Sequence, residues 1–249
     1  MDGLEKIELL KIPINIIPPE KVEEIAYKLL SEKKPASIVL LSYFDLLKAR
    51  SAGEYRDFVL NASLVIPISK SIISGAKFLK LTPPIRYMPF DFIVNLLTSL
   101  EKREQSVYLL GGKPAALLKT EKNIRQTFPS LRVIGRYPGY YKKQNEQTII
   151  TMIRKSTPSL LLVGQGVHGR EKWLAHNNEK LGRGIHLWCS DIFDVFAERR
   201  KYPSRALFNL GLEWAGYFIQ KPVRFFRVFP FLYYNILLLI TRIAQKGKS

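Results

Sequence analysis

Short apolar runs of strand length recur along this chain, and stretches with helical periodicity separate them. The runs are rich in Val, Ile and Leu and end near Gly, Pro or Ser: Ser37–Leu41, Ser63–Pro67, Val107–Gly111, Leu131–Tyr137, Leu160–Gly164 and Gly184–Trp188. Strands that alternate with helices form βαβ units, and continuously apolar strands are buried on both faces. The sequence therefore predicts an α/β fold with a mostly parallel sheet.

Five segments between these runs carry apolar residues at helical spacing. In the first segment, Val22, Ile25 and Leu29 would share one face of a helix. The five segments are Pro19–Glu32, Asp91–Lys102, Pro114–Phe128, Glu146–Lys155 and Glu171–Lys180. We expect amphipathic helices there, with their apolar sides packed on both faces of the sheet.

The chain has a formal net charge of +18, and half of this charge lies near the C-terminus. Residues 199–249 contain ten Lys or Arg residues and a single acid, Glu213, and aromatic residues are interleaved with the basic ones. This combination is typical of a segment that lies on an anionic membrane surface. A helix pair that packs its aromatic face on the core is the alternative. We predict a core domain, 1–198, and a membrane-associating helical appendage, 199–249.

Other features indicate a cytoplasmic protein. Cys189 is the single cysteine, which excludes an intramolecular disulfide and a Cys-based zinc cluster. The first residues lack the basic and apolar regions of a signal peptide. The longest apolar stretch, Phe225–Ile240, is interrupted by Arg227, Pro230 and Asn235 and falls short of the roughly 20 residues that span a bilayer. We expect a peripheral protein on the inner face of the cell membrane, without a spanning helix.

Two glycine-rich turns stand between a predicted strand and a predicted helix. Glycine lets the backbone approach an anion closely, and the N–H groups of a first helical turn carry partial positive charge. In doubly wound sheets, ligands bind beyond the carboxyl ends of the strands. The turns predict a phosphate-binding site, although a purely steric need for glycine is the alternative. The candidate binding residues are Gly111, Gly112, Gly164, Gly166, Arg170 and Glu171.

No recognised metal or nucleophile motif is present in the sequence. His168, His176 and His186 show no metal-site spacing, and Gly-x-Ser-x-Gly does not occur. We therefore expect no metal and no cofactor. The aspartates that could act as a general base are Asp45, Asp57, Asp91, Asp191 and Asp194. For Asp191 and Asp194, a helix cap or a first-turn acid is the simpler explanation.

The order of these motifs resembles the WecG/TagA/CpsF family of bacterial glycosyltransferases over nearly the whole chain. The blocks that carry the resemblance are Arg86 with Asp91, Val107–Gly112, Pro129–Gly135 with Gly139–Tyr141, Pro158–Gly166 with Glu171–Trp173, Phe193–Asp194, Gly211–Trp214 and Pro222–Arg227. The resemblance implies a Rossmann-like core that moves an N-acetylhexosamine from a UDP-sugar to a polyprenyl-diphosphate-linked acceptor in cell-surface polysaccharide synthesis. It also implies a basic appendage that touches the membrane, and it suggests self-association.

Only some of the site residues that the resemblance implies are present at the matching positions of this sequence. Arg86, Arg224 and Arg227 match family arginines that meet the nucleotide-sugar phosphates, a role that suits the permanently charged guanidinium. The family base is the aspartate of a Pro-Asp-Gly turn, and Ile68 stands at that position here. The other departures are Ser42 for an asparagine, His168 and Arg170 for Pro and Gln, and Tyr217 for an arginine.

These losses leave two functions open. The first is a divergent transferase in which Asp91, Asp191, Asp194 or a substrate phosphate takes the proton. General-base assistance is worth about 10²–10⁴-fold, so a transferase that lacks it is slow but real. The second is a non-catalytic, membrane-associated binding or scaffolding subunit of a polysaccharide assembly complex. Nucleic-acid binding is not expected, because the sequence shows no nucleic-acid module. The sequence leaves the donor sugar, the acceptor and the oligomeric state open.

Overall fold

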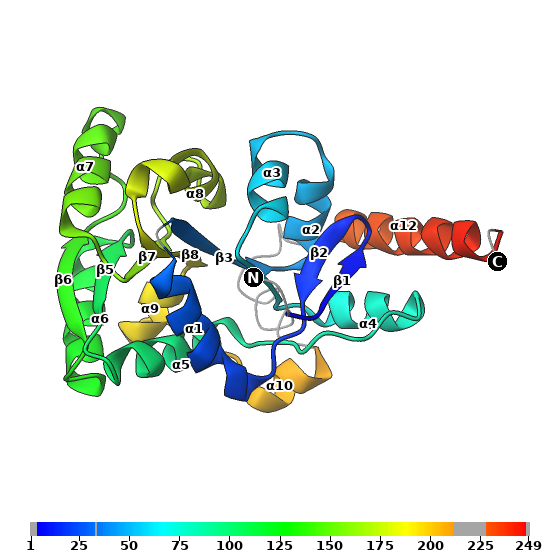
Figure 1. Cartoon of the computed structure of the whole chain (residues 1–249), viewed down its shortest axis with the longest axis horizontal. Helices are drawn as coiled ribbons and strands as arrows, with labels where there is room; N and C mark the ends of the chain where they lie inside the picture. The colour runs from blue at the N-terminus through cyan, green and yellow to red at the C-terminus, as the bar shows by residue number, and fades with distance from the viewer. Residues whose placement is uncertain (1–3, 33, 212–227, 248–249) are drawn as a thin grey trace.

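The computed structural model describes residues 4–32, 34–211 and 228–247, and all six predicted strands are present in one sheet (Figure 1). These strands are β3 (Pro35–Leu41), β4 (Leu64–Pro67), β5 (Ser106–Leu110), β6 (Arg132–Tyr137), β7 (Leu160–Gly164) and β8 (Gly184–Ser190). They lie in the order β4-β3-β8-β7-β5-β6, and every neighbouring pair is parallel. The predicted α/β class with a Rossmann-like parallel sheet is confirmed.

Helices cover both faces of the sheet, as the sequence predicts. Successive side chains of a strand point to opposite faces, so Leu160 and Leu162 pack with one helix layer and Leu161 and Val163 with the other. The first layer consists of α1 (Val22–Ser31), α5 (Pro89–Glu101), α6 (Pro114–Thr127) and α9 (Ile192–Phe196). The second consists of α2 (Tyr43–Arg50), α3 (Glu54–Leu60), α7 (Glu146–Ser156) and α8 (Glu171–Asn177). Short 3-10 turns are η1 (Pro19–Lys21), η2 (Lys143–Asn145) and η3 (Asn178–Leu181).

The helix layers place a crevice at the carboxyl ends of the central strands. The chain leaves β5 towards α6 in the first layer, and it leaves the neighbouring β7 towards α8 in the second layer. Ligands are expected to bind at this edge of the sheet, where neighbouring strands connect to opposite helix layers.

An N-terminal hairpin, which the sequence analysis did not predict, covers the β4 edge. Strands β1 (Lys6–Leu9) and β2 (Ile12–Asn15) pair antiparallel through a two-residue turn in which Leu10 and Lys11 both have positive φ. The Asn15 side-chain oxygen accepts a hydrogen bond of 2.8 Å from the Val65 amide. The hairpin thereby satisfies a backbone donor on the edge strand, which would otherwise be open to pairing with another chain.

The described part of the apolar C-terminal segment forms one continuous helix, α12 (Val228–Lys246), in line with the predicted helical appendage, and the expectation of no spanning helix stays a prediction. Pro230 lies in the first helical turn, where a missing N–H costs nothing. Asn235 satisfies its side-chain amide by donating to the Phe231 carbonyl, 2.7 Å away. By length and composition, this helix is apolar enough to cross a membrane.

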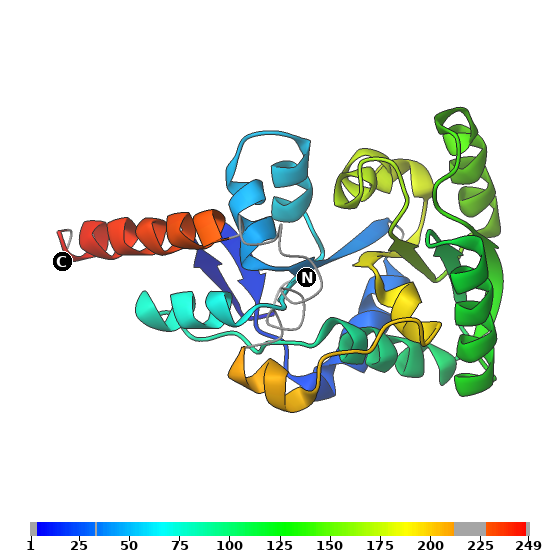
Figure 2. The same cartoon turned by 180° about the vertical axis from the view of Figure 1, so that it is seen from behind.

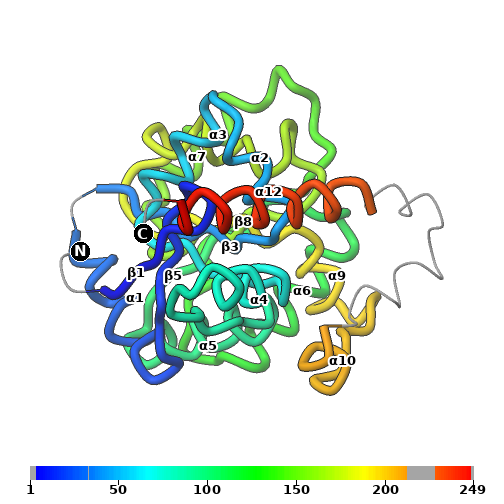
Figure 3. The backbone as a smooth tube through the Cα atoms, turned by 90° about the vertical axis from the view of Figure 1, so that its right-hand side faces the viewer, coloured from blue at the N-terminus to red at the C-terminus, as the bar shows by residue number. Residues whose placement is uncertain are grey.

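One face of α12 packs on the globular domain. Tyr234 and Leu238 are buried in the core formed with β1, β2, α2 and α4 (Lys70–Phe78). The Tyr234 hydroxyl donates to the Ser71 carbonyl at 3.0 Å, and the Tyr43 ring lies 6.0 Å from the Tyr234 ring. Figure 3 shows α12 running across α4. The helix is therefore anchored to the fold, and the boundary at residues 198 and 199 stays a prediction.

The opposite face of α12 is exposed over much of its described length. Its exposed apolar side chains are Phe229, Phe231, Leu232, Tyr233, Ile236, Leu239, Ile240 and Ile243. Figures 1 and 2 show that the C-terminal part of the helix projects beyond the rest of the fold, at the end opposite β6 and α7.

Replacing Gly75 of α4 by Leu should detach α12. A Cβ atom at this position would overlap the Tyr234 hydroxyl and lie 3.2 Å from a Leu238 methyl group. We expect the free energy of unfolding to fall by about 1–3 kcal/mol and the α12 amides to exchange faster. Ser74→Leu adds the same side chain at an exposed position of the same helix and should leave α12 protected. Equal hydrogen exchange in the two variants would contradict the anchor.

Candidate active site

Backbone hydrogen bonds join the three loops that follow β5, β6 and β7. The Gly112 amide donates to the Gln165 carbonyl at 2.7 Å, and the Gly139 amide donates to the Gly112 carbonyl at 2.8 Å. The Tyr140 amide donates to the Gly166 carbonyl at 2.6 Å. These bonds hold the loops in register and form one wall of the crevice.

The glycines of these loops are required because neighbouring groups occupy the space of a side chain. A Cβ atom on Gly111 would lie 2.8 Å from the Gly164 carbonyl carbon, and one on Gly164 would lie 2.7 Å from the Phe193 ring. At Gly166, it would lie 2.6 Å from the Tyr140 ring. Such distances are far below van der Waals contact, so the steric alternative for these glycines holds.

The amides of the first glycine turn are already hydrogen-bonded. Gly111 donates to the Tyr137 carbonyl at 2.9 Å, and Gly112 donates to Gln165 as described above. The next residues open helix α6, whose N-cap, Lys113, makes no side-chain capping bond. An anion at this turn would therefore meet the first amides of α6 rather than the two glycine amides, and the binding role of Gly111, Gly112, Gly164 and Gly166 stays a prediction.

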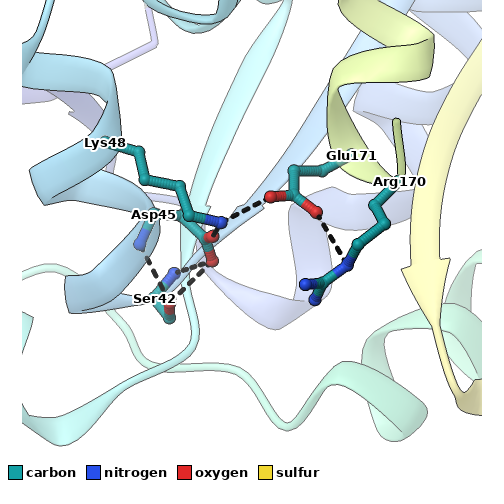
Figure 4. Close-up of polar contacts among 5 residues, drawn as sticks. All are labelled: Ser42, Asp45, Lys48, Arg170 and Glu171. Carbon is teal, nitrogen blue, oxygen red and sulfur yellow. Dashed lines mark hydrogen bonds and ion pairs between the residues drawn. The ribbon is translucent and has the colours of Figure 1, made fainter. Parts of the chain in front are cut away.

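The opposite wall of the crevice carries a polar network between α2 and α8 (Figure 4). Ser42 begins α2 with a capping box, in which its Oγ accepts from the Asp45 amide at 3.2 Å and donates to Asp45 Oδ2 at 2.6 Å. Lys48 forms an ion pair with Glu171 at the start of α8 and lies 3.5 Å from Asp45 Oδ1. Arg170 approaches Glu171 at 3.6 Å. The structure thus brings the predicted residues Arg170 and Glu171 together with a helix that the sequence analysis did not predict.

The two carboxyl groups of this network differ in pKa. Burial raises the pKa of Asp45 above its ordinary value, and the hydrogen bond from Ser42 and the charge of Lys48 offset this only in part. For Glu171, burial alone would raise the pKa. The hydrogen bond from Lys48, the hydrogen bond from the Glu171 amide and the charges of Lys48 and Arg170 outweigh this effect, so the pKa of Glu171 lies below its ordinary value. The pKa values of these two carboxyl groups are therefore shifted in opposite directions from their ordinary values.

Backbone strain is concentrated at the same end of the sheet. Tyr140, Arg170 and Ser190 all have positive φ, and they follow or end β6, β7 and β8. Arg170 has φ 56° and ψ −129°, a combination that side chains other than glycine disfavour. Strained residues of this kind cluster at functional sites because the surrounding structure must hold them.

Each of the three predicted base candidates has a partner. Asp191 and Asp194 follow β8 and lie at the crevice, where Asp191 pairs with Arg200 and Asp194 accepts a hydrogen bond from the Gln165 side chain. Asp91 lies in the first turn of α5, 3.5 Å from an Arg205 nitrogen. The structure thus brings two of the three to the crevice, and no observation assigns the role of base to any of them.

Arg86 and Lys70 hold the C-terminal end of α10 (Arg205–Leu210) against the altered turn. Arg86 donates to the carbonyls of Ile68 at 3.0 Å and Phe208 at 2.7 Å, and its guanidinium lies over the Phe208 ring. Lys70 Nζ donates to the last two carbonyls of α10, at 3.2 and 2.9 Å. Cations at this end of a helix are favourable because its carbonyls carry partial negative charge. The phosphate role of Arg86 stays a prediction.

Other expectations fall outside these observations. Arg224, Arg227 and Tyr217 lie outside the described residues. Among residues 4–32, 34–211 and 228–247, no group of three or more His, Cys, Asp or Glu side chains is placed to hold a metal ion.

The sequence analysis did not identify Lys48 as a site residue. The Ser-x-x-Asp pattern at Ser42 is a signal for the start of a helix, and that helix would have included Lys48.

Replacing Lys48 by Ala should destabilise the fold at neutral pH. The variant leaves the Glu171 carboxylate, whose side chain is 12% exposed, without its lysine partner, and a loss of about 1–3 kcal/mol is expected. A carboxyl with a lowered folded-state pKa stabilises above its unfolded pKa, which is 4.5 for a glutamate, and this contribution is lost as the pH falls through the folded-state pKa. Urea unfolding at neutral and acidic pH measures the difference in free energy of unfolding between the wild type and Lys48→Ala. This difference should be smaller at acidic pH.

A matched control is Lys102→Ala, which removes the exposed ion pair with Glu23. Exposed ion pairs contribute little to stability, so the free energy of unfolding of this variant should remain close to that of the wild type at both pH values. A loss of stability in Lys48→Ala that does not depend on pH would contradict the stabilising role of the Lys48–Glu171 ion pair. Equal losses of stability in the two variants would also contradict it.

Comparison with known proteins agrees with this architecture. The model of the glycosyl transferase WecG/TagA/CpsF family matches residues 7–249. A similar curated protein is the N-acetylglucosaminyldiphosphoundecaprenol N-acetyl-beta-D-mannosaminyltransferase of Bacillus spizizenii, which is 22% identical over 199 residues, or 80% of this chain and 77% of the relative. Because the family match includes every strand of the six-stranded sheet and the loops of the crevice, the chain belongs to the WecG/TagA/CpsF family of glycosyltransferases.

Proposed function

We propose that this protein transfers an N-acetylhexosamine from a UDP-sugar to a polyprenyl-diphosphate-linked acceptor during cell-surface polysaccharide synthesis. The family match across the crevice is the observation that carries the proposal. The printed name of the Bacillus relative describes a mannosaminyl transfer to a lipid-diphosphate-linked N-acetylglucosamine, so donor and acceptor of these classes are the natural first substrates.

The proposed reaction is a direct displacement at the anomeric carbon, with UDP as the leaving group. Negative charge develops on the diphosphate as the bond breaks, and positioned cations stabilise such charge. Arg86 lies beside the turn after β4, and the structure shows its guanidinium held by two carbonyls. Arg224 and Arg227 are proposed to act with it. These arginines supply the positive charge, so the proposal includes neither a metal nor a cofactor.

A non-catalytic role is the second candidate, and the side chain at position 68 favours it. Ile68 occupies the position at which the family resemblance places an aspartate base, and it has no group that accepts a proton. A binding or scaffolding subunit of a polysaccharide assembly complex would keep the fold and the membrane helix without this carboxylate.

We further propose that the protein is peripheral on the cytoplasmic face of the cell membrane. The exposed apolar side chains of α12 would lie in the interface, while Tyr234 and Leu238 keep the helix on the domain. A helix of 19 residues is about 28 Å long, so it could span the hydrocarbon core only if this packing were released. Arg242 and Lys246, near its end, suit anionic headgroups. Self-association stays part of the proposal.

Calorimetric titration with UDP and with UDP-N-acetylhexosamines tests the nucleotide site. We expect micromolar binding by the wild type and at least about tenfold weaker binding by Arg86→Ala, because a charge-assisted phosphate contact contributes about 1.5–3 kcal/mol. Arg205→Ala removes a more exposed arginine nearby and should bind UDP as the wild type does. An unchanged dissociation constant in Arg86→Ala would refute its phosphate role. Absence of binding by folded wild-type protein would favour the scaffolding role.

Vesicle flotation tests the membrane surface of α12. Ile240→Asp places a charge on the exposed apolar face and should release the protein from vesicles that contain anionic lipid. Leu118→Asp makes the same change at an exposed leucine of α6 and should have no effect. Wild-type binding should survive moderate salt, because apolar burial is not screened. Flotation of Ile240→Asp at the wild-type level would contradict the proposal.

A further inference from the structure

The turn that lacks the family aspartate lies directly against the start of α2. The Ile68 amide donates to the Leu41 carbonyl at 3.0 Å, and the Tyr43 amide donates to Ser69 Oγ at 2.9 Å. Ser42 stands between these two contacts, at the carboxyl end of β3. Because Leu41 and Pro67 are register partners of the parallel strands β3 and β4, the residues that follow them, Ser42 and Ile68, lie next to each other at this edge of the sheet.

Ser42 connects this position to a carboxylate. The Ser42 hydroxyl donates to Asp45 Oδ2 at 2.6 Å, while its oxygen accepts the Asp45 amide. The capping box explains why the two side chains are ordered, but an asparagine at position 45 would satisfy the same bonds. The capping role does not require the negative charge of Asp45.

Asp45 differs from the other carboxylates of this region in the charged side chains that contact it. Arg200 pairs with Asp191, and Arg205 pairs with Asp91. The Asp45 carboxyl has no arginine among the contacts of the described residues and lies 3.5 Å from Lys48, which is also paired with Glu171.

The groups that face Asp45 act in opposite directions on its pKa. Burial raises it most, and the negative charge of Glu171 on α8 adds to this, whereas Lys48 and the Ser42 hydrogen bonds lower it. Tyr55 of α3 also faces this site, since its pKa is raised by burial and by the charges of Asp45 and Glu171. The result is a raised pKa for Asp45. A general base works best when its pKa is near the operating pH.

We infer that Ser42 and Asp45 together form the relocated proton acceptor of the transfer reaction, an inference that rests on the proposed function. The acceptor hydroxyl oxygen bonds to the anomeric carbon while the bond from that carbon to UDP breaks, and UDP leaves with the bonding electrons. The acceptor proton passes to Ser42 Oγ as the Ser42 proton passes to Asp45 Oδ2. Asp45 then returns this proton to solvent, since 24% of its side-chain surface is exposed.

The decisive variant is Asp45→Asn, which keeps the capping bonds and removes the base. We assay the full-length protein with UDP-N-acetylmannosamine and a short-chain prenyl-diphosphate-linked N-acetylglucosamine. We expect kcat to fall at least about 100-fold with little change in KM for the donor, as for loss of a general base. The rise of kcat with pH in the wild type should be absent from the variant.

Two further variants separate proton transfer from a structural effect. Ser42→Ala should lower kcat comparably, and Ser42→Thr, which restores a hydroxyl, should recover most of it. Glu24→Gln removes an exposed acid of α1 and should match the wild type. Carbon NMR of labelled aspartate should show a wild-type signal that titrates above the ordinary value of 3.8 and is missing from Asp45→Asn.

The possible results are distinct. Wild-type activity with a retained kcat or an unchanged pH profile in Asp45→Asn would overturn the inference and leave the proposed function intact. A titration of Asp45 at or below 3.8 would also overturn it. Failure of the folded wild type to transfer sugar would overturn the proposed function and the inference with it. Loss of kcat and of the pH dependence, with recovery in Ser42→Thr, would establish the relay.

Discussion

Strands β5 and β7 are buried on both faces along their whole length, and the other features of the fold follow from this burial. Side chains that alternate between two apolar faces require a helix layer on each side of the sheet. Polar chemistry is then excluded from the middle of the strands and is confined to their ends. The loops at the carboxyl ends can lie close together because Gly111, Gly164 and Gly166 remove the side chains that would keep them apart.

The carboxylates at the carboxyl ends of the strands differ in the charged groups that contact them. Asp91 and Asp191 each pair with an arginine, whereas Asp45 accepts a hydrogen bond from the Ser42 hydroxyl and shares Lys48 with Glu171. Burial without a dedicated cation is the condition that raises the pKa of a carboxyl group.

Helix α12 is attached to the domain through a packed seam with α4. Gly75 allows the Tyr234 ring to approach α4, and Leu238 continues the contact one turn later. Arg86 and Lys70 hold the other described part of the appendage, α10, on the turn after β4. Because both attachments are to the β4 side of the sheet, the apolar face of α12 has a defined orientation relative to the crevice.

The sequence by itself determined the strands and most of the helices that cover them, because apolar periodicity is a local property that burial enforces. It did not reveal the hairpin, since Leu10 and Lys11 lack the glycine or asparagine that usually marks such a turn. It predicted a helical appendage, and the structure adds that helix α12 continues through Pro230 and Asn235, where the apolar pattern is interrupted. Only the tertiary structure decided which charged groups meet. Lys48 and Glu171 are 123 positions apart, and the pKa of Asp45 depends on burial by elements that no local pattern brings together.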